Sequence, residues 1–129
     1  MGGSSEESGM LPGLAAEFPS GATYSSLAID VDGNASPAVL RLSGELDSDT
    51  AGSLDTQGRA LVADQHRHLI LDCSGLTFCD SFGLRTMMNL WQSVQPDGSV
   101  TIASPSDHLN RLLQITGLSD TLRARPVTN

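Results

Sequence analysis

Ser81 is the residue whose surroundings favour chemistry most clearly. It follows Asp80 and precedes Phe82, and an apolar series with helical spacing begins at Leu84. One interpretation is an N-cap, in which the hydroxyl accepts a backbone N–H bond at the start of the helix. The other is phosphorylation, because a strand-to-helix turn presents such a hydroxyl at the protein surface. The local pattern leaves both interpretations open.

The histidines and cysteines of the chain do not form the patterns that are typical of metal or redox sites. His66 and His68 alternate at the entrance of an expected strand and lack a third ligand, and we expect solvated loop histidines. His108 is the third of the three histidines. Cys73 and Cys79 do not form a C-x-x-C pair, so packed, reduced thiols are expected. The sequence therefore predicts no metal site and no cofactor.

The sequence also lacks the residue patterns that are typical of enzyme active sites. The chain contains no lysine, so a lysine nucleophile is excluded, and it has no glycine-rich loop of the phosphate-binding type. The segment from Cys79 to Gly83 does not match the G-x-S-x-G turn of serine hydrolases. We expect a protein without enzymatic activity.

Composition narrows the class of partner. Seven Arg or Lys against fifteen Asp or Glu give a net charge of −8. This balance argues against nucleic acid and against an anionic membrane surface as partners. No apolar run approaches the ~20 residues that span a bilayer, and the N-terminus lacks the features of a secretory signal. We expect a cytoplasmic protein. A protein partner with a basic face remains open, although the net charge by itself indicates only solubility.

The elements that position Ser81 follow from periodicity. Residues 26–33 and 38–47 alternate as strands and are joined by turn residues, which predicts an antiparallel pair. A helix over 47–64 is expected to be capped by Asp47, Ser48 or Asp49, with Gly58 as a weak spot. The continuous apolar run in 68–75 is typical of a central parallel strand.

The remaining elements complete an alternating pattern. A helix follows Ser81, with Leu84, Met87, Met88, Trp91 and Val94 as its core-facing stripe. A strand over 99–104 precedes a helix with Ser104 as N-cap, Pro105 at its first position and Gly117 as its stop. Residues 121–127 are expected to form an edge strand.

This order indicates an α/β fold, with a mixed sheet of about five strands in which a β-hairpin is followed by β-α units. Residues 1–22 are rich in Gly, Ser and Glu and are expected to be a flexible tail. Residues 23–129 are expected to form a single domain.

Three segments in register resemble one family. The segment LILDCSGLTFCDSFGLRTMMNLW, residues 69–91, is similar to the core of the STAS-domain anti-sigma factor antagonists, in which Asp-Ser-x-Gly-Leu opens a helix. LSGELDSDTAGSL at 42–54 and SPSDHLNRLLQITGLSDTL at 104–122 resemble two further family motifs in the same order. Together the resemblance extends from about residue 27 to residue 125.

The resemblance implies a STAS-like sheet with helices on one side, and a role as an anti-sigma factor antagonist. The expected partner is an ATP-binding anti-sigma factor that is also a serine kinase, with a phosphatase acting on the phosphorylated form. Ser81 matches the family's phosphorylated serine, and phosphorylation would block binding. Asp47 and Asp80 match acids that line the same surface, and Gly83 and Leu84 match the pair that opens the helix.

The chain departs from the family pattern at Phe82, where many members have Ser or Thr, and at Arg85, where many have Gly. Both belong to the expected partner-binding surface, and Arg85 could pair with a phosphate or with Asp80. The family's last helix is expected to be absent or cut off, since the chain stops at Asn129. A STAS-type scaffold of the stressosome kind, or a ligand-sensing signalling module, remains the alternative function.

Overall fold

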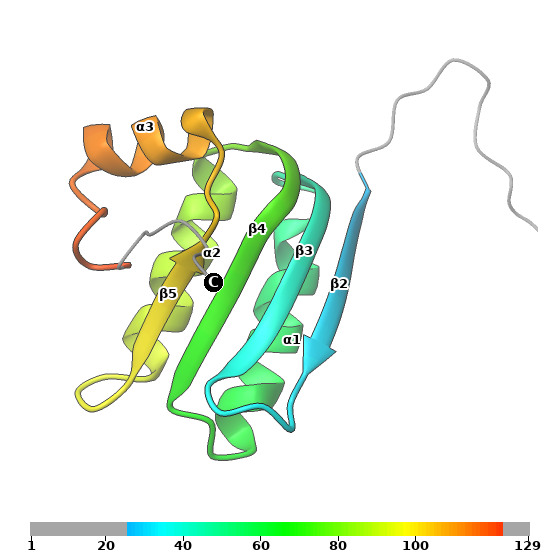
Figure 1. Ribbon diagram of the computed structural model, residues 1–129, viewed down its shortest axis with the longest axis vertical. Helices are drawn as coiled ribbons and strands as arrows, with labels where there is room; N and C mark the ends of the chain where they lie inside the picture. The colour runs from blue at the N-terminus through cyan, green and yellow to red at the C-terminus, as the bar shows by residue number, and fades with distance from the viewer. Residues whose placement is uncertain (1–25, 123–129) are drawn as a thin grey trace, which may run out of the picture.

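The computed structural model describes residues 26–122, which form one sheet with helices against it (Figure 1). The expected tail at 1–22 and most of the expected edge strand at 121–127 lie outside these residues. In chain order the elements are β2 (Leu27–Asp32), β3 (Ala38–Leu46), α1 (Ala51–Ala63), β4 (His68–Cys79), α2 (Ser81–Ser93), β5 (Ser99–Ala103) and α3 (Asp107–Thr116).

The sheet is mixed, as the sequence predicts. Its strand order is β2-β3-β4-β5, with an antiparallel β2–β3 hairpin and parallel pairs β3–β4 and β4–β5. The described residues contain four strands rather than about five. The N–H of Ile102 donates to the carbonyl of Leu122 at 3.1 Å, so the chain runs beside β5 where the described part ends.

Helices α1 and α2 lie behind the sheet in Figure 1, and α3 crosses beyond the end of β5. Each of the first two helices connects one parallel strand to the next, α1 between β3 and β4 and α2 between β4 and β5. Because successive crossovers of one hand place their helices on one face, this connectivity covers a single side of the sheet. The expected arrangement of helices is confirmed.

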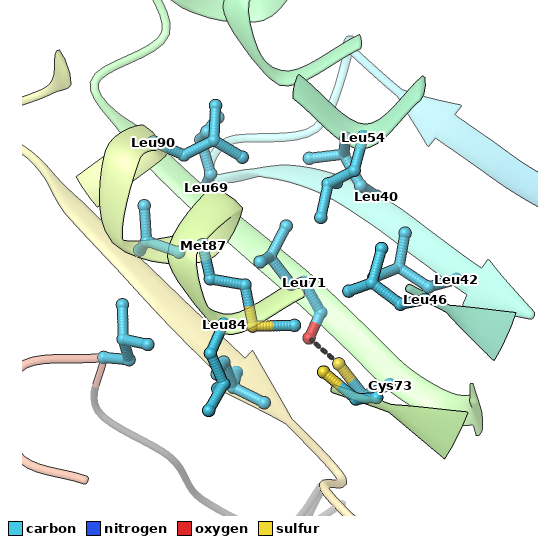
Figure 2. Packing of buried hydrophobic residues seen from close by; sticks show 14 of the residues in the cluster. Leu40, Leu42, Leu46, Leu54, Leu69, Leu71, Cys73, Leu84, Met87 and Leu90 are labelled. Atoms are coloured by element: carbon cyan, nitrogen blue, oxygen red, sulfur yellow. Dashed lines mark hydrogen bonds between the residues drawn. The ribbon is translucent and has the colours of Figure 1, made fainter. Parts of the chain in front are cut away.

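The core lies between that face and the two helices (Figure 2). The alternate residues Ala38, Leu40 and Leu42 of β3 share one face and are at most 2% exposed. On α2 the predicted stripe is confirmed, with the side chain of Met87 fully buried and Trp91 at the margin. Burying one large apolar side chain contributes about 1.5–3 kcal/mol, so this layer is the main source of stability.

Gly58 lies where α1 packs against α2. A Cβ placed on Gly58 would lie 2.6 Å from a methyl carbon of Leu90 on α2. The absence of a side chain therefore allows α1 and α2 to approach closely, and the low helix propensity expected at Gly58 stays a prediction.

Two predicted helix starts are wrong. Helix α1 begins at Ala51 after Thr50, which makes no side-chain cap bond, and none of Asp47, Ser48 or Asp49 occupies the cap position. Helix α3 begins at Asp107, and its cap is Ser106, whose Oγ accepts from the N–H of Leu109 at 3.1 Å. Several cap-forming residues stand next to one another at both starts, and local sequence does not choose between them.

The predicted end of α3 is confirmed. Gly117 adopts a left-handed conformation with φ of 77°, and the N–H of Leu118 donates to the carbonyl of Leu113 at 2.8 Å. This closes the helix with the residue type that carries the smallest penalty for positive φ.

The cysteines are free and buried, as expected for packed thiols. Burial, and to a smaller extent the neighbouring Asp80 carboxylate, raise the pKa of Cys79 to about 12. Burial also raises the pKa of Cys73. Because the thiolate is the reactive form, neither side chain is suited to nucleophilic chemistry.

Candidate functional site

The candidate site lies at the edge of the sheet where β3 and β4 end. These strands are parallel, and their last residues, Leu46 and Cys79, are partners in the register. Asp47 and Asp80 follow them directly, and the N–H of Asp80 donates to the carbonyl of Leu46 at 3.1 Å. Two acids that are 33 residues apart in the chain are thereby brought to one edge of the sheet.

Asp80, not Ser81, caps α2. The Asp80 backbone is extended, and its Oδ1 accepts from the N–H of Phe82 at 2.9 Å and of Gly83 at 3.2 Å. A carboxylate is also favoured at this end by the helix dipole. The N-cap interpretation of Ser81 is therefore wrong, and Ser81 is the first residue of α2.

The hydroxyl of Ser81 is consequently not used by the helix. Ser81 is exposed, and its hydroxyl makes no hydrogen bond within residues 26–122. It begins the exposed face of α2, which consists of Ser81, Phe82, Arg85, Asn89 and Gln92. This hydroxyl is accessible to a modifying enzyme without any unfolding of the helix.

Gly83 and Leu84 lie on the opposite side of the same turn and are buried. A Cβ on Gly83 would lie 2.7 Å from Cγ of Leu46 and 2.9 Å from Sγ of Cys79. Leu84 is 5% exposed and belongs to the core. These two residues hold the first turn of α2 against the ends of β3 and β4, and their place in a partner-binding surface stays a prediction.

Asp47 is partly buried within a local turn. Its Oδ1 accepts from the N–H of Asp49 at 2.9 Å and lies 3.4 Å from Oγ1 of Thr50. The Thr50 hydroxyl in turn donates to the carbonyl of Glu45 at 2.7 Å. Asp47 therefore shapes the connection from β3 to α1 in addition to lying at the site edge.

Two aromatic rings make this edge apolar as well as acidic. Phe78, near the end of β4, is 44% exposed, and Phe82 is 53% exposed. The Phe78 ring stacks on His108 in the first turn of α3, with ring centroids 6.5 Å apart and planes 16° from parallel. The sequence analysis did not identify Phe78 or His108 as a site residue. An inward-facing Cys79 nevertheless implies that its neighbour Phe78 faces outward, because side chains alternate along a strand.

The described residues are not arranged as a metal site, and two of the three histidines contact other side chains. Among residues 26–122 there is no group of three His, Cys, Asp or Glu side chains able to hold a metal ion. His68 begins β4 rather than lying in a loop, and its Nδ1 is 2.8 Å from Oγ of Ser99. In the same part of the chain no helix is long and apolar enough to cross a membrane. The end of β4 and the start of α2 instead present exposed aromatic rings and the exposed hydroxyl of Ser81.

Comparison with known proteins agrees with this geometry. The model of the family described as "Mlab, STAS domain" matches residues 29–124. The chain is 30% identical over 95 residues to the anti-sigma F factor antagonist of Paenibacillus polymyxa, covering 72% of this chain and 81% of the relative.

Solved structures show the same fold. An anti-sigma factor antagonist from Mycobacterium paratuberculosis superposes with a TM-score of 0.72 at 26% identity, covering 79% of this chain and 87% of the other. The unphosphorylated form of the anti-sigma factor antagonist SpoIIAA has a TM-score of 0.70 at 20% identity, with coverage of 79% and 90%. The phosphorylated form of SpoIIAA, a cell fate determinant of Bacillus, has a TM-score of 0.65 at 20% identity, with coverage of 79% and 93%.

Proposed function

Because the chain belongs to the STAS-domain family of anti-sigma factor antagonists, we propose that it binds an anti-sigma factor that is also a serine kinase, and that phosphorylation of Ser81 ends this binding. The observation that carries the proposal is the position of Ser81. Its hydroxyl is exposed at the first residue of α2, while Asp80 performs the capping. We infer a cytoplasmic location, because the proposed switch requires ATP and an anti-sigma factor.

The docking surface consists of Phe78, Ser81, Phe82 and Arg85 at the end of β4 and the start of α2. Exposed aromatic rings contribute strongly to binding when a partner buries them. The acids that border this surface and the net charge of −8 favour a partner with basic groups around an apolar contact. Gly83 and Leu84 support the surface from beneath.

The chemical step is a phosphoryl transfer from ATP. The γ-phosphoryl group moves to Oγ of Ser81, ADP leaves, and the hydroxyl proton passes to a base of the kinase. A phosphatase restores the original state by hydrolysis of the ester, which releases inorganic phosphate and regenerates the hydroxyl. This chain is the substrate in both steps and supplies no catalytic group.

The switch is electrostatic. A serine phosphate carries a charge close to −2 at neutral pH. If it faces an anion of the kinase, such as a nucleotide phosphate, the repulsion at about 4 Å is a few kcal/mol. Since 1.4 kcal/mol is about tenfold in affinity, a single phosphate is sufficient to release the complex. SpoIIAA, with structures in both forms, supports the use of this fold for such a switch.

Titration calorimetry with the cognate anti-sigma factor tests the proposal. Ser81→Ala is expected to bind like the unmodified protein, and Ser81→Asp to bind at least about tenfold more weakly. The matched control is Gln92→Glu, which adds one negative charge to the same exposed face about 16 Å further along the helix. Equal affinities for Ser81→Asp and the unmodified protein would contradict the proposal.

A further inference from the structure

Arg85 lies one helical turn after Ser81 on the exposed face of α2. Side chains four residues apart on a helix are neighbours, with Cβ atoms about 5–6 Å from each other. Both residues are exposed, and the Arg85 side chain is long. Its guanidinium can therefore reach a group attached to the Ser81 oxygen without rearrangement of the backbone.

The Arg85 guanidinium also has no other partner within residues 26–122. The nearest acid along the chain, Asp80, already accepts two backbone N–H bonds at the start of α2. Three other arginines are engaged: Arg41 with Asp30, Arg59 with Asp55, and Arg67 with the carbonyl of Val94. Arg85 is thus a cation beside the proposed modification site that the fold itself does not use.

We propose that Arg85 is the intramolecular partner of a phosphate on Ser81. The inference rests on the proposed function, in which Ser81 is the modified residue. A guanidinium presents two parallel N–H groups that match the spacing of phosphate oxygens, and such charge-assisted bonds are stronger than neutral ones. The helical spacing of four residues brings the two groups together in the folded protein.

The pair changes what phosphorylation does to the docking surface. In the unmodified protein, the exposed Arg85 cation is available to a carboxylate of the partner. After phosphorylation, Arg85 is drawn to the phosphate of its own chain. The modification therefore acts twice, because it adds negative charge and also withdraws a cation from the interface.

The test uses the full chain with phosphoserine incorporated at position 81 during translation, so that no kinase is needed. Phosphorus NMR follows the second pKa of the phosphate as the pH is varied. A neighbouring cation favours the dianion and lowers this pKa. Arg85→Gln is therefore expected to raise the pKa by about half a unit, and concentrated salt to reduce the difference.

The control is Arg59→Gln, which removes the same charge from α1 and is expected to leave the phosphate pKa unchanged. Equal pKa values in the parent protein and Arg85→Gln would overturn the proposed pair. An equal rise in Arg59→Gln would also overturn it, because the effect would then belong to the overall charge. Failure of the proposed function is a separate result, seen as tight binding of Ser81→Asp.

Discussion

The two ends of α2 are charged in opposite ways. At its N-terminus the Asp80 carboxylate accepts from the first backbone N–H groups. At its C-terminus an Arg67 guanidinium nitrogen lies 3.4 Å from the carbonyl of Val94, which it approaches as a donor. Both placements complement the helix dipole, which is positive at the start and negative at the end.

The surfaces around these two ends of α2 differ in shape and in the side chains that they expose. Arg67, which contacts the C-terminal end, also lines a hollow of about 220 Å³ together with Ser36, Pro37, Gln65, His66 and His68, and α2 contributes no residue to its lining. Two of the polar side chains that line the hollow make contacts within the protein, His68 with Ser99 and Arg67 with the carbonyl of Val94. The N-terminal end keeps a serine hydroxyl and two phenylalanine rings exposed. Under the proposed function the hollow is not the docking site, because docking of a macromolecule requires exposed contact groups rather than a cavity.

The largest effect on stability is expected where α2 touches β3. Gly83→Ala places a methyl group against Leu46 and Cys79, and overpacking of this kind costs about 1–3 kcal/mol. Gly52→Ala on α1 is the control, because a Cβ there meets no atom within 4 Å, and it is expected to stabilise by about 0.5–1 kcal/mol. Urea unfolding measures both, and a destabilisation of Gly52→Ala equal to that of Gly83→Ala would contradict the packing argument.

A second comparison measures how the surface at the start of α2 and the hollow each contribute to binding of the anti-sigma factor. Phe82→Ala is expected to weaken binding of the cognate anti-sigma factor by about 10–100-fold, since a buried aromatic anchor contributes 2 kcal/mol or more. Its stability should hardly change, because the ring is 53% exposed. His66→Ala at the hollow is expected to leave the affinity unchanged. A larger loss of affinity for His66→Ala than for Phe82→Ala would contradict the proposed docking surface and would indicate the hollow instead.

The smallest effects are expected from the caps themselves. Asp80→Ala removes the acceptor of two backbone N–H bonds and should cost about 1 kcal/mol, with Asp80→Asn costing less because it keeps an oxygen. Arg67→Gln loses one long bond and should change stability by less than about 0.5 kcal/mol. Thermal unfolding ranks the three variants. If Arg67→Gln proves the most damaging, the C-terminal end is more important for folding than its contacts indicate.

Much of the fold was predictable because the relevant signals are local. Alternation predicted the strand β3, whose Ala38, Leu40 and Leu42 are buried, and helical spacing placed Met87 of α2 in the core. Helix starts were less predictable, since Asp80 and Ser81 are adjacent, Ser104 and Ser106 are only two residues apart, and these residue types have similar capping ability. The choice between them depends on where the preceding strand ends, and neighbouring strands decide this.

The sequence by itself determined the order of elements and the presence of Ser81 at the start of a helix, because both depend on residues close together in the chain. Only the tertiary structure decided that Phe78 stacks on His108 and that Gly83 must lack a side chain, and the strand register showed how Asp47 and Asp80, which the family resemblance assigns to one surface, reach the same edge. The physical reason is that these contacts depend on strand register and on the space left between packed elements. Neither quantity is encoded in the properties of any short segment.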